Sequence, residues 1–126
     1  MPLLVPVSVG ELCDKISILE LKLAAITDPA KRANVAAEFA ALDGVRRREV
    51  DASPALNEVW QELRTVNRRL WQIEDDLRRL EREDRFDGEF VELARAVYQN
   101  NDRRAVLKRR INALTGSEIV EEKTYV

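Results

Sequence analysis

Polar residues interrupt an apolar stripe near the end of this 126-residue chain. The stretch VYQNNDRRAVLKRRIN, residues 97–112, is typical of a helix, and heptad-like steps from Phe90 place Asn101, Arg104 and Lys108 in core-facing registers. Because burial of an unpaired charge is prohibitive, each inward-facing side chain must meet a carboxylate, a backbone carbonyl or a bound anion. A register shifted by one residue would instead leave these side chains in water.

Side chains that would complete a polar layer occur in two other helical stretches. They are Glu11 and Asp14 in the first stretch, and Asn67, Trp71, Glu74 and Asp75 in the third. As a satisfied hydrogen-bond network, this layer would fix the register of a generic helical bundle. As a pocket, it would bind a small anionic ligand between the helices. We favour the network and keep the pocket as the alternative.

The chain contains no histidine, which removes several kinds of catalytic and metal site. Ser-His-Asp and Cys-His catalysis, His-ligated zinc and the Glu-x-x-His di-iron site of helical bundles are all excluded. Cys13 is the single cysteine, so no intrachain disulfide forms, and we interpret its thiol as a small apolar core group. We therefore expect no metal ion and no cofactor.

Three aromatic side chains are candidates for the wall of a ligand site. Trp60 and Trp71 are interpreted as core residues rather than as ligand platforms, because large aromatic side chains dominate most helical cores. Tyr98 is expected to be buried with its hydroxyl bonded inside the protein, and a bond to a ligand is the alternative.

The composition predicts one all-α domain over residues 1–126. With 45% hydrophobic and 35% charged residues, the chain fits a single compact soluble unit with a modest core. Only four glycines and four prolines leave little material for turns, whereas helix-forming Leu, Ala, Glu and Arg abound.

Cap signals divide the chain into four helical stretches. Ser8, Asp28 and Ser53 are each followed by Pro or by a Glu three residues on, which marks a helix start. The predicted helices cover about 9–26, 29–48, 54–80 and 90–115, with a charged turn at 81–90. Short connections between them predict an up-down antiparallel bundle of about four helices, followed by a polar C-terminal tail.

The third helix carries the longest apolar pattern in the chain. Its stripe alternates steps of three and four through Leu56, Val59, Leu63, Val66, Leu70, Ile73, Leu77 and Leu80. This period of 3.5 predicts a helix about 40 Å long that packs in coiled-coil fashion. The pattern leaves a homodimer open. It also leaves open a break of the fourth helix at Asn100-Asn101 and docking of the tail through Ile119, Val120 and Tyr125.

The charge pattern argues against nucleic acid as a partner. The formal net charge is −2, and the paired arginines at 68–69, 78–79, 103–104 and 109–110 are mostly interleaved with Asp and Glu. The start MPLLVPVSVG lacks the features of a signal peptide, and no segment approaches the about 20 apolar residues of a membrane span. We expect a cytoplasmic protein that binds neither nucleic acid nor membrane.

Four blocks of this sequence resemble a bacterial family catalogued only as a domain of unknown function. The blocks are GELCDKISIL, NRRLWQIEDDLR, FVELARAVYQNNDRRAVLKRRIN and SEIVEEKTY, at residues 10–19, 67–78, 90–112 and 117–125. The resemblance implies a glycan-related accessory role, because members look to be encoded among glycosyltransferase and surface-polysaccharide genes. It supplies no established catalytic residues. The motif positions coincide with those that the periodicity singled out.

Two functions from different classes fit these residues. The first is a non-catalytic module that binds a partner protein or an anionic ligand similar to a nucleotide sugar. Its candidate ligand-binding residues are Lys15, Trp71, Glu74, Asp75, Arg95, Tyr98, Asn101, Asp102, Arg104 and Lys108.

The second is an all-α enzyme that looks like a chorismate mutase, in which Arg and Lys orient and stabilise a dianion without a nucleophile. General acid-base work by Glu74 and Asp75 near Lys108 is a further option. Adjacent positions point about 100° apart on a helix, which argues against a close carboxylate pair. Whether the chain is an enzyme stays open at this point.

Overall fold

The computed structural model describes residues 1–124 and has four helices joined by short turns. They are α1 (Val9–Ala25), α2 (Pro29–Glu49), α3 (Pro54–Arg82) and α4 (Gly88–Thr115). No residue of 1–124 lies in a β-strand, so the all-α prediction is confirmed, as is the long third helix of 29 residues. None of these helices is long and apolar enough to cross a membrane.

The predicted caps start the first three helices. The side chains of Ser8, Asp28 and Ser53 each accept a hydrogen bond from the backbone N–H three residues on, at 2.9 to 3.0 Å. This satisfies one of the N–H groups that have no partner within a helix. At the other end of the chain, α4 stops at Gly116, whose φ of 65° is the left-handed conformation that glycine adopts without strain.

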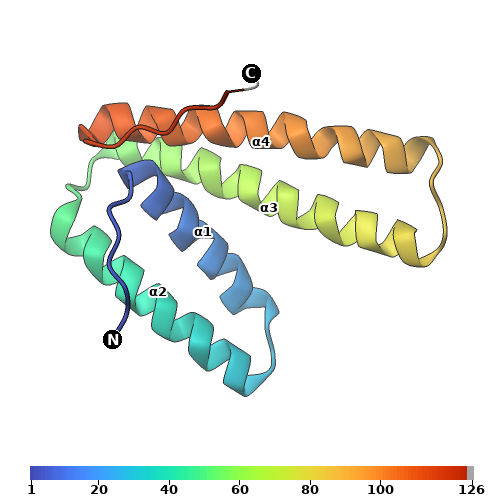
Figure 1. Ribbon diagram of the computed structural model, residues 1–126, viewed down its shortest axis with the longest axis horizontal. Coiled ribbons are helices and arrows are strands. Elements are labelled where there is room, and N and C mark those ends of the chain that lie inside the picture. Colours follow the sequence, from blue (N-terminus) through green and yellow to red (C-terminus); the bar gives the residue numbers. More distant parts are fainter. Residues whose placement is uncertain (125–126) are drawn as a thin grey trace.

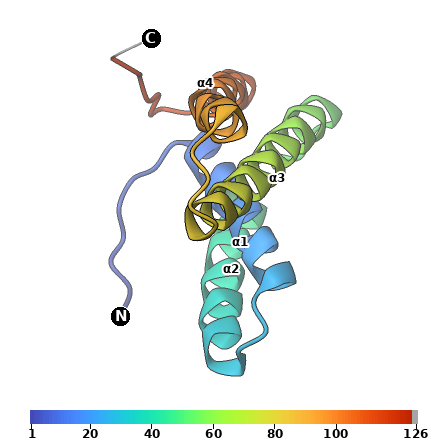
Figure 2. The same ribbon diagram turned by 90° about the vertical axis from the view of Figure 1, so that its right-hand side faces the viewer.

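The four helices form two hairpins (Figure 1). The α1–α2 and α3–α4 hairpins meet near the starts of α1 and α3 and diverge from there (Figure 1). Helix α1 packs against each of the other three helices, which makes it the centre of the fold. Turned by 90°, the molecule shows α3 and α4 crossing above the α1–α2 hairpin, and residues 1–7 extending away from the helices (Figure 2).

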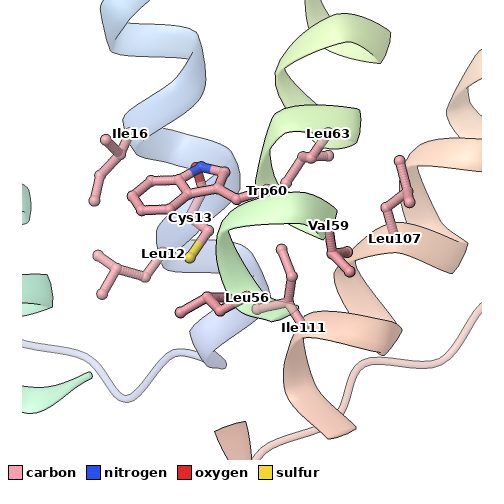
Figure 3. Packing of buried hydrophobic residues seen from close by; sticks show 9 residues of the cluster. All are labelled: Leu12, Cys13, Ile16, Leu56, Val59, Trp60, Leu63, Leu107 and Ile111. Atoms are coloured by element: carbon pink, nitrogen blue, oxygen red, sulfur yellow. The ribbon is translucent and has the colours of Figure 1, made fainter. Parts of the chain in front are cut away.

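The core lies where the hairpins meet. Cys13 and Ile16 of α1, Leu63 of α3, and Leu107 and Ile111 of α4 are at most 1% exposed and pack together (Figure 3). A cluster this dry favours association of the two hairpins at this end, because each buried side chain contributes about 1.5 to 3 kcal/mol. The alternating stripe of α3 supplies four further buried residues, Leu56, Val59, Ile73 and Leu80, in agreement with its pattern.

Trp60 closes one side of this core. Its indole N–H donates to the Cys13 carbonyl oxygen at 3.1 Å and to Ser17 Oγ at 2.9 Å. The guanidinium of Arg64 lies 4.2 Å from the ring centroid, where a cation is attracted to the aromatic face. Trp60 is 5% exposed, so its interpretation as a core residue is confirmed.

Helix α4 and the tail settle two alternatives that the sequence left open. The helix is continuous through Asn100, whose Nδ2 donates to the Ala96 carbonyl oxygen at 2.8 Å. Residues 117–124 then run back along α4 (Figure 1). The tail does not dock on the helices by burying Ile119 and Val120, because these side chains are 39% and 47% exposed. Tyr125 lies outside the described residues.

Candidate functional site

Asp14 is the centre of a buried polar network where α1 meets α3 and α4. Its side chain is 1% exposed. Asn67 Nδ2 donates to Asp14 Oδ1 at 2.9 Å, Arg104 Nε donates to the same oxygen at 2.9 Å, and a terminal nitrogen of Arg104 donates to the second oxygen. One carboxylate therefore binds groups from two other helices.

The electrostatics of this pair fix Arg104 as a permanent cation. The hydrogen bond with Asp14 raises the pKa of Arg104, burial opposes this, and the charges of Asp14 and Glu11 raise it further, for a net increase above the ordinary value. A guanidinium in this state keeps its proton and serves as a structural charge.

A second ion pair joins α1 and α4 one turn away. Lys108 Nζ lies 2.5 Å from Glu11 Oε2, and Lys15 Nζ lies 3.7 Å from the other oxygen of Glu11. Both Arg104 and Lys108 thus meet carboxylates of α1. The prediction of a network between these helices is confirmed for Arg104 and Lys108, which are explained without any bound anion. Asn101, the third polar residue of α4 that was expected to face the core, has no hydrogen bond within residues 1–124.

The same crossing is also held by a backbone contact. The Gly10 N–H donates to Asn112 Oδ1 at 2.7 Å, and both residues are buried. A Cβ at position 10 would collide with the Lys108 carbonyl oxygen. Only glycine permits this approach of α1 to α4, a constraint that the sequence analysis missed, although a glycine one residue into a helix was a visible signal.

Cys13 is unsuited to nucleophilic chemistry. Burial raises the pKa of its thiol from 9.0 to about 11, and the charges of Arg46 and Arg64 only partly oppose this. The reactive thiolate is therefore scarce near neutral pH. The interpretation of Cys13 as a core residue is confirmed.

A cleft of about 410 Å³ opens beside the network, between α1 and the α3–α4 hairpin. Its apolar wall comes from all three helices and consists of Ile18, Leu21, Leu70, Trp71 and Val97. Its polar residues are Asn67, Glu74, Asp75, Arg78, Asn101 and Arg104. Five predicted site residues therefore line one cleft: Trp71, Glu74, Asp75, Asn101 and Arg104.

The polar residues of the cleft fall into two groups. Asn67 and Arg104 are bound to Asp14 in the network. The side chains of Glu74, Asp75, Arg78 and Asn101 form no hydrogen bond or ion pair with any part of residues 1–124. Hydrogen-bonding groups that remain available beside an apolar wall are the usual make-up of a binding site.

Comparison with family models gives a match that covers almost the whole chain. The matching model is described as a Family of unknown function (DUF6165), and it spans residues 3–126. The chain belongs to this family. Searches of curated proteins and of solved structures returned no match.

In this family member, the other predicted site residues lie away from the cleft. Lys108 and Asp102 line a second cavity, of about 560 Å³, between α4 and the tail. Lys15 and Arg95 are exposed. The expectation of a buried Tyr98 is wrong, because this residue is 53% exposed. Trp71 is only half-buried, so its assignment to the core is also corrected.

Metal ligation finds no support among the described residues. Within 1–124, no three Cys, Asp or Glu side chains are arranged as ligands of one ion. The carboxylates at the helix crossing face cations instead, as Asp14 and Glu11 illustrate. What the site offers chemically is a shaped apolar surface with polar groups at its edge.

Proposed function

We propose that this protein is a non-catalytic binding module, and that the cleft between α1, α3 and α4 receives an apolar segment of a partner protein. One observation carries the proposal: an apolar wall from three helices lies beside four polar side chains that have no partner within residues 1–124. The cleft volume of about 410 Å³ is in the range of natural binding pockets.

The charges of the cleft favour a protein segment over an anionic ligand. Arg104 is already neutralised by Asp14 behind the wall, which leaves Arg78 as the one cation against Glu74 and Asp75. A nucleotide sugar entering this cleft would meet more carboxylates than uncompensated cations. An apolar segment can pack on the wall while the exposed Glu74, Asp75 and Arg78 stay in contact with water, so no charge has to lose its hydration.

The same pairing weakens the case for an enzyme that resembles a chorismate mutase. Such an enzyme needs several cations aimed at one dianion. Here Arg104 is bound to Asp14 and lines the cleft, whereas Lys108 is bound to Glu11 and lines the other cavity. The two cations therefore do not converge on one space.

The cellular role that we propose is that of an accessory protein in glycan or surface-polysaccharide biosynthesis. This part of the proposal rests on the resemblance described above. A partner taken up by the cleft would then be a protein of that machinery, and the module would recruit or position it.

Site-specific photocrosslinking tests the cleft directly. A benzophenone amino acid would replace Trp71 in one variant and Gln99, an exposed residue of α4 outside the cleft, in the control. In cells of the source organism, we expect a protein adduct at position 71 and none at position 99. The captured protein is then purified, and its affinity for wild type, Trp71→Ala and Gln99→Ala is measured by calorimetry.

We expect Trp71→Ala to weaken this binding at least tenfold and Gln99→Ala to change it less than twofold. Equal adducts at both positions, or full affinity of Trp71→Ala, would overturn the proposal. So would a nucleotide sugar that raises the Tm of the wild type but not that of Trp71→Ala, because the cleft would then be a small-molecule site.

A further inference from the structure

The second cavity of the molecule lies under the tail and is independent of the cleft. We call it the tail groove. On the α4 side it is lined by Asp102, Ala105, Val106, Lys108, Arg109 and Asn112, and on the other side by tail residues 121–123. Its volume of about 560 Å³ means that the tail lies over the groove without filling it.

Opposite charges match residue by residue between the tail and α4. Glu121 Oε2 lies 3.6 Å from Lys108 Nζ, Glu122 Oε2 lies 2.5 Å from Arg109 NH1, and Lys123 Nζ lies 2.8 Å from Asp102 Oδ1. In addition, the Ser8 hydroxyl donates to Glu121 Oε1 at 2.5 Å. The charges of α4 in the groove are therefore complementary to an extended segment with two acidic residues followed by a basic one.

The tail is held by these charges rather than by burial. Ile119 and Val120, the apolar residues just before the charged run, are largely exposed. The carboxylates of Glu121 and Glu122 are 49% and 63% exposed, so water and salt weaken their ion pairs. A segment needed for folding would be expected to bury its apolar side chains, and this one does not.

The helices keep their own contacts without the tail. The Ser8 hydroxyl oxygen also accepts from the Glu11 N–H at 3.0 Å, and Lys108 also binds Glu11 at 2.5 Å. Release of Glu121 would leave both of these interactions in place. Departure of the tail therefore exposes a preformed site instead of unfolding the crossing of α1 and α4.

We propose that the tail groove is a binding site for an extended acidic peptide segment of a partner protein, and that the tail occupies it in cis. The recognised pattern is Glu-Glu-Lys, as in residues 121–123. An occupant tethered to the same chain acts at an effective concentration of about millimolar, so it blocks weak ligands and yields to stronger ones.

Competition between the tail and a free peptide tests this proposal in the full-length chain. The probe is a fluorescein-labelled peptide of residues 117–124, SEIVEEKT, and its binding is followed by anisotropy at low salt. The receptor variants are wild type, the double variant Glu121→Gln/Glu122→Gln, and the control Glu118→Gln, whose carboxylate is exposed and has no ion pair within residues 1–124.

We expect the double variant to bind the peptide at least tenfold more tightly than wild type or Glu118→Gln, because its own tail competes less. Adding Arg109→Glu to the double variant should weaken binding at least fivefold. The same loss is expected for the peptide SEIVQQKT, and the affinity should fall as salt rises. Circular dichroism should show the same helix content in every variant, since all the changed residues are exposed.

Three results would overturn the proposal. The first is equal affinity of wild type and the double variant, which would mean that the tail does not occupy the peptide site. The second is equal binding of SEIVEEKT and SEIVQQKT, which would remove the recognition of carboxylates. The third is a wild-type dimer that Glu121→Gln/Glu122→Gln dissociates, which would make a second copy of this chain the occupant.

Discussion

Replacement of Arg104 by Met should destabilise the protein far more than any neighbouring charge substitution. The variant leaves the Asp14 carboxylate, 1% exposed, with Asn67 as its remaining side-chain partner. Removing one member of a buried ion pair costs about 3 to 5 kcal/mol. Because the Arg104 side chain is 29% exposed at the cleft, water can reach the vacated space, so we expect a loss of about 3 kcal/mol.

Urea denaturation followed by circular dichroism and tryptophan fluorescence would measure this loss. Lys108→Met should cost at most about 1 kcal/mol, since its partners Glu11 and Glu121 are 24% and 49% exposed. Arg103→Met, next to Arg104 and paired with an exposed Glu62, should change stability by less than about 0.5 kcal/mol. If Arg104→Met cost no more than Lys108→Met, the buried network would not be the element that holds the hairpins together.

A second variant tests whether the loss comes from the stranded charge. Replacing both partners, in Asp14→Leu/Arg104→Met, removes the uncompensated carboxylate as well as the cation. Apolar replacements of buried ion pairs are often neutral. The double variant should therefore be more stable than Arg104→Met, and a strictly additive result would mean that the two side chains do not interact.

Two further predictions concern the same helix crossing. Gly10→Ala should cost about 1 to 3 kcal/mol in urea denaturation, because its Cβ must push α1 away from the Lys108 carbonyl oxygen; wild-type stability would mean that the helices are not in close contact. For Cys13, the folded state holds its proton up to a pKa of about 11 and the unfolded state only to 9.0, so stability should fall as pH rises from 9 to 11. The loss should approach about 3 kcal/mol and be absent in Cys13→Ala; parallel pH profiles of the two proteins would contradict it.

Local sequence signals predicted the helices and part of the network: Glu11, Asp14 and Asn67 belong to it, whereas Glu74 and Asp75 do not. Ser8, Asp28 and Ser53 act through N–H groups three residues away, so their effect is contained in a few consecutive residues. Because Arg104 and Lys108 occupy core-facing positions, each needs a carboxylate partner. Asp14 and Glu11 lie about one turn apart on α1 and are such carboxylates. Periodicity and the cost of buried charge predicted that Arg104 and Lys108 need partners, but not which of the candidate carboxylates they bind.

Trp71 illustrates where sequence reasoning failed, and Trp60 where it succeeded. They are 11 residues apart on α3, which is about three turns, so they lie on nearly the same face of the helix. Trp60 lies where α1 covers that face, and Trp71 lies further along, where the hairpins have diverged and the cleft opens. Periodicity gives the face of a residue but not the point along the helix at which a neighbouring helix ends its contact.

The tail shows the same limit. Its polar composition was plain from the sequence, and apolar docking was considered because Ile119, Val120 and Tyr125 are hydrophobic. The structure docks it through Glu121, Glu122 and Lys123 instead. Ion pairs at sequence separations of 13 to 21 residues depend on where the chain turns back, which no local pattern specifies.

The sequence by itself determined the all-α class, the helix starts and the need to neutralise two cations in the fourth helix. These follow from caps, from the 3.5-residue period and from the free energy of burying charge, all of which act through residue type and spacing. Only the tertiary structure decided which apolar side chains remain uncovered and which polar side chains have no hydrogen-bond partner. That depends on the divergence of two hairpins around α1, and this divergence opens the cleft that we propose as the binding site.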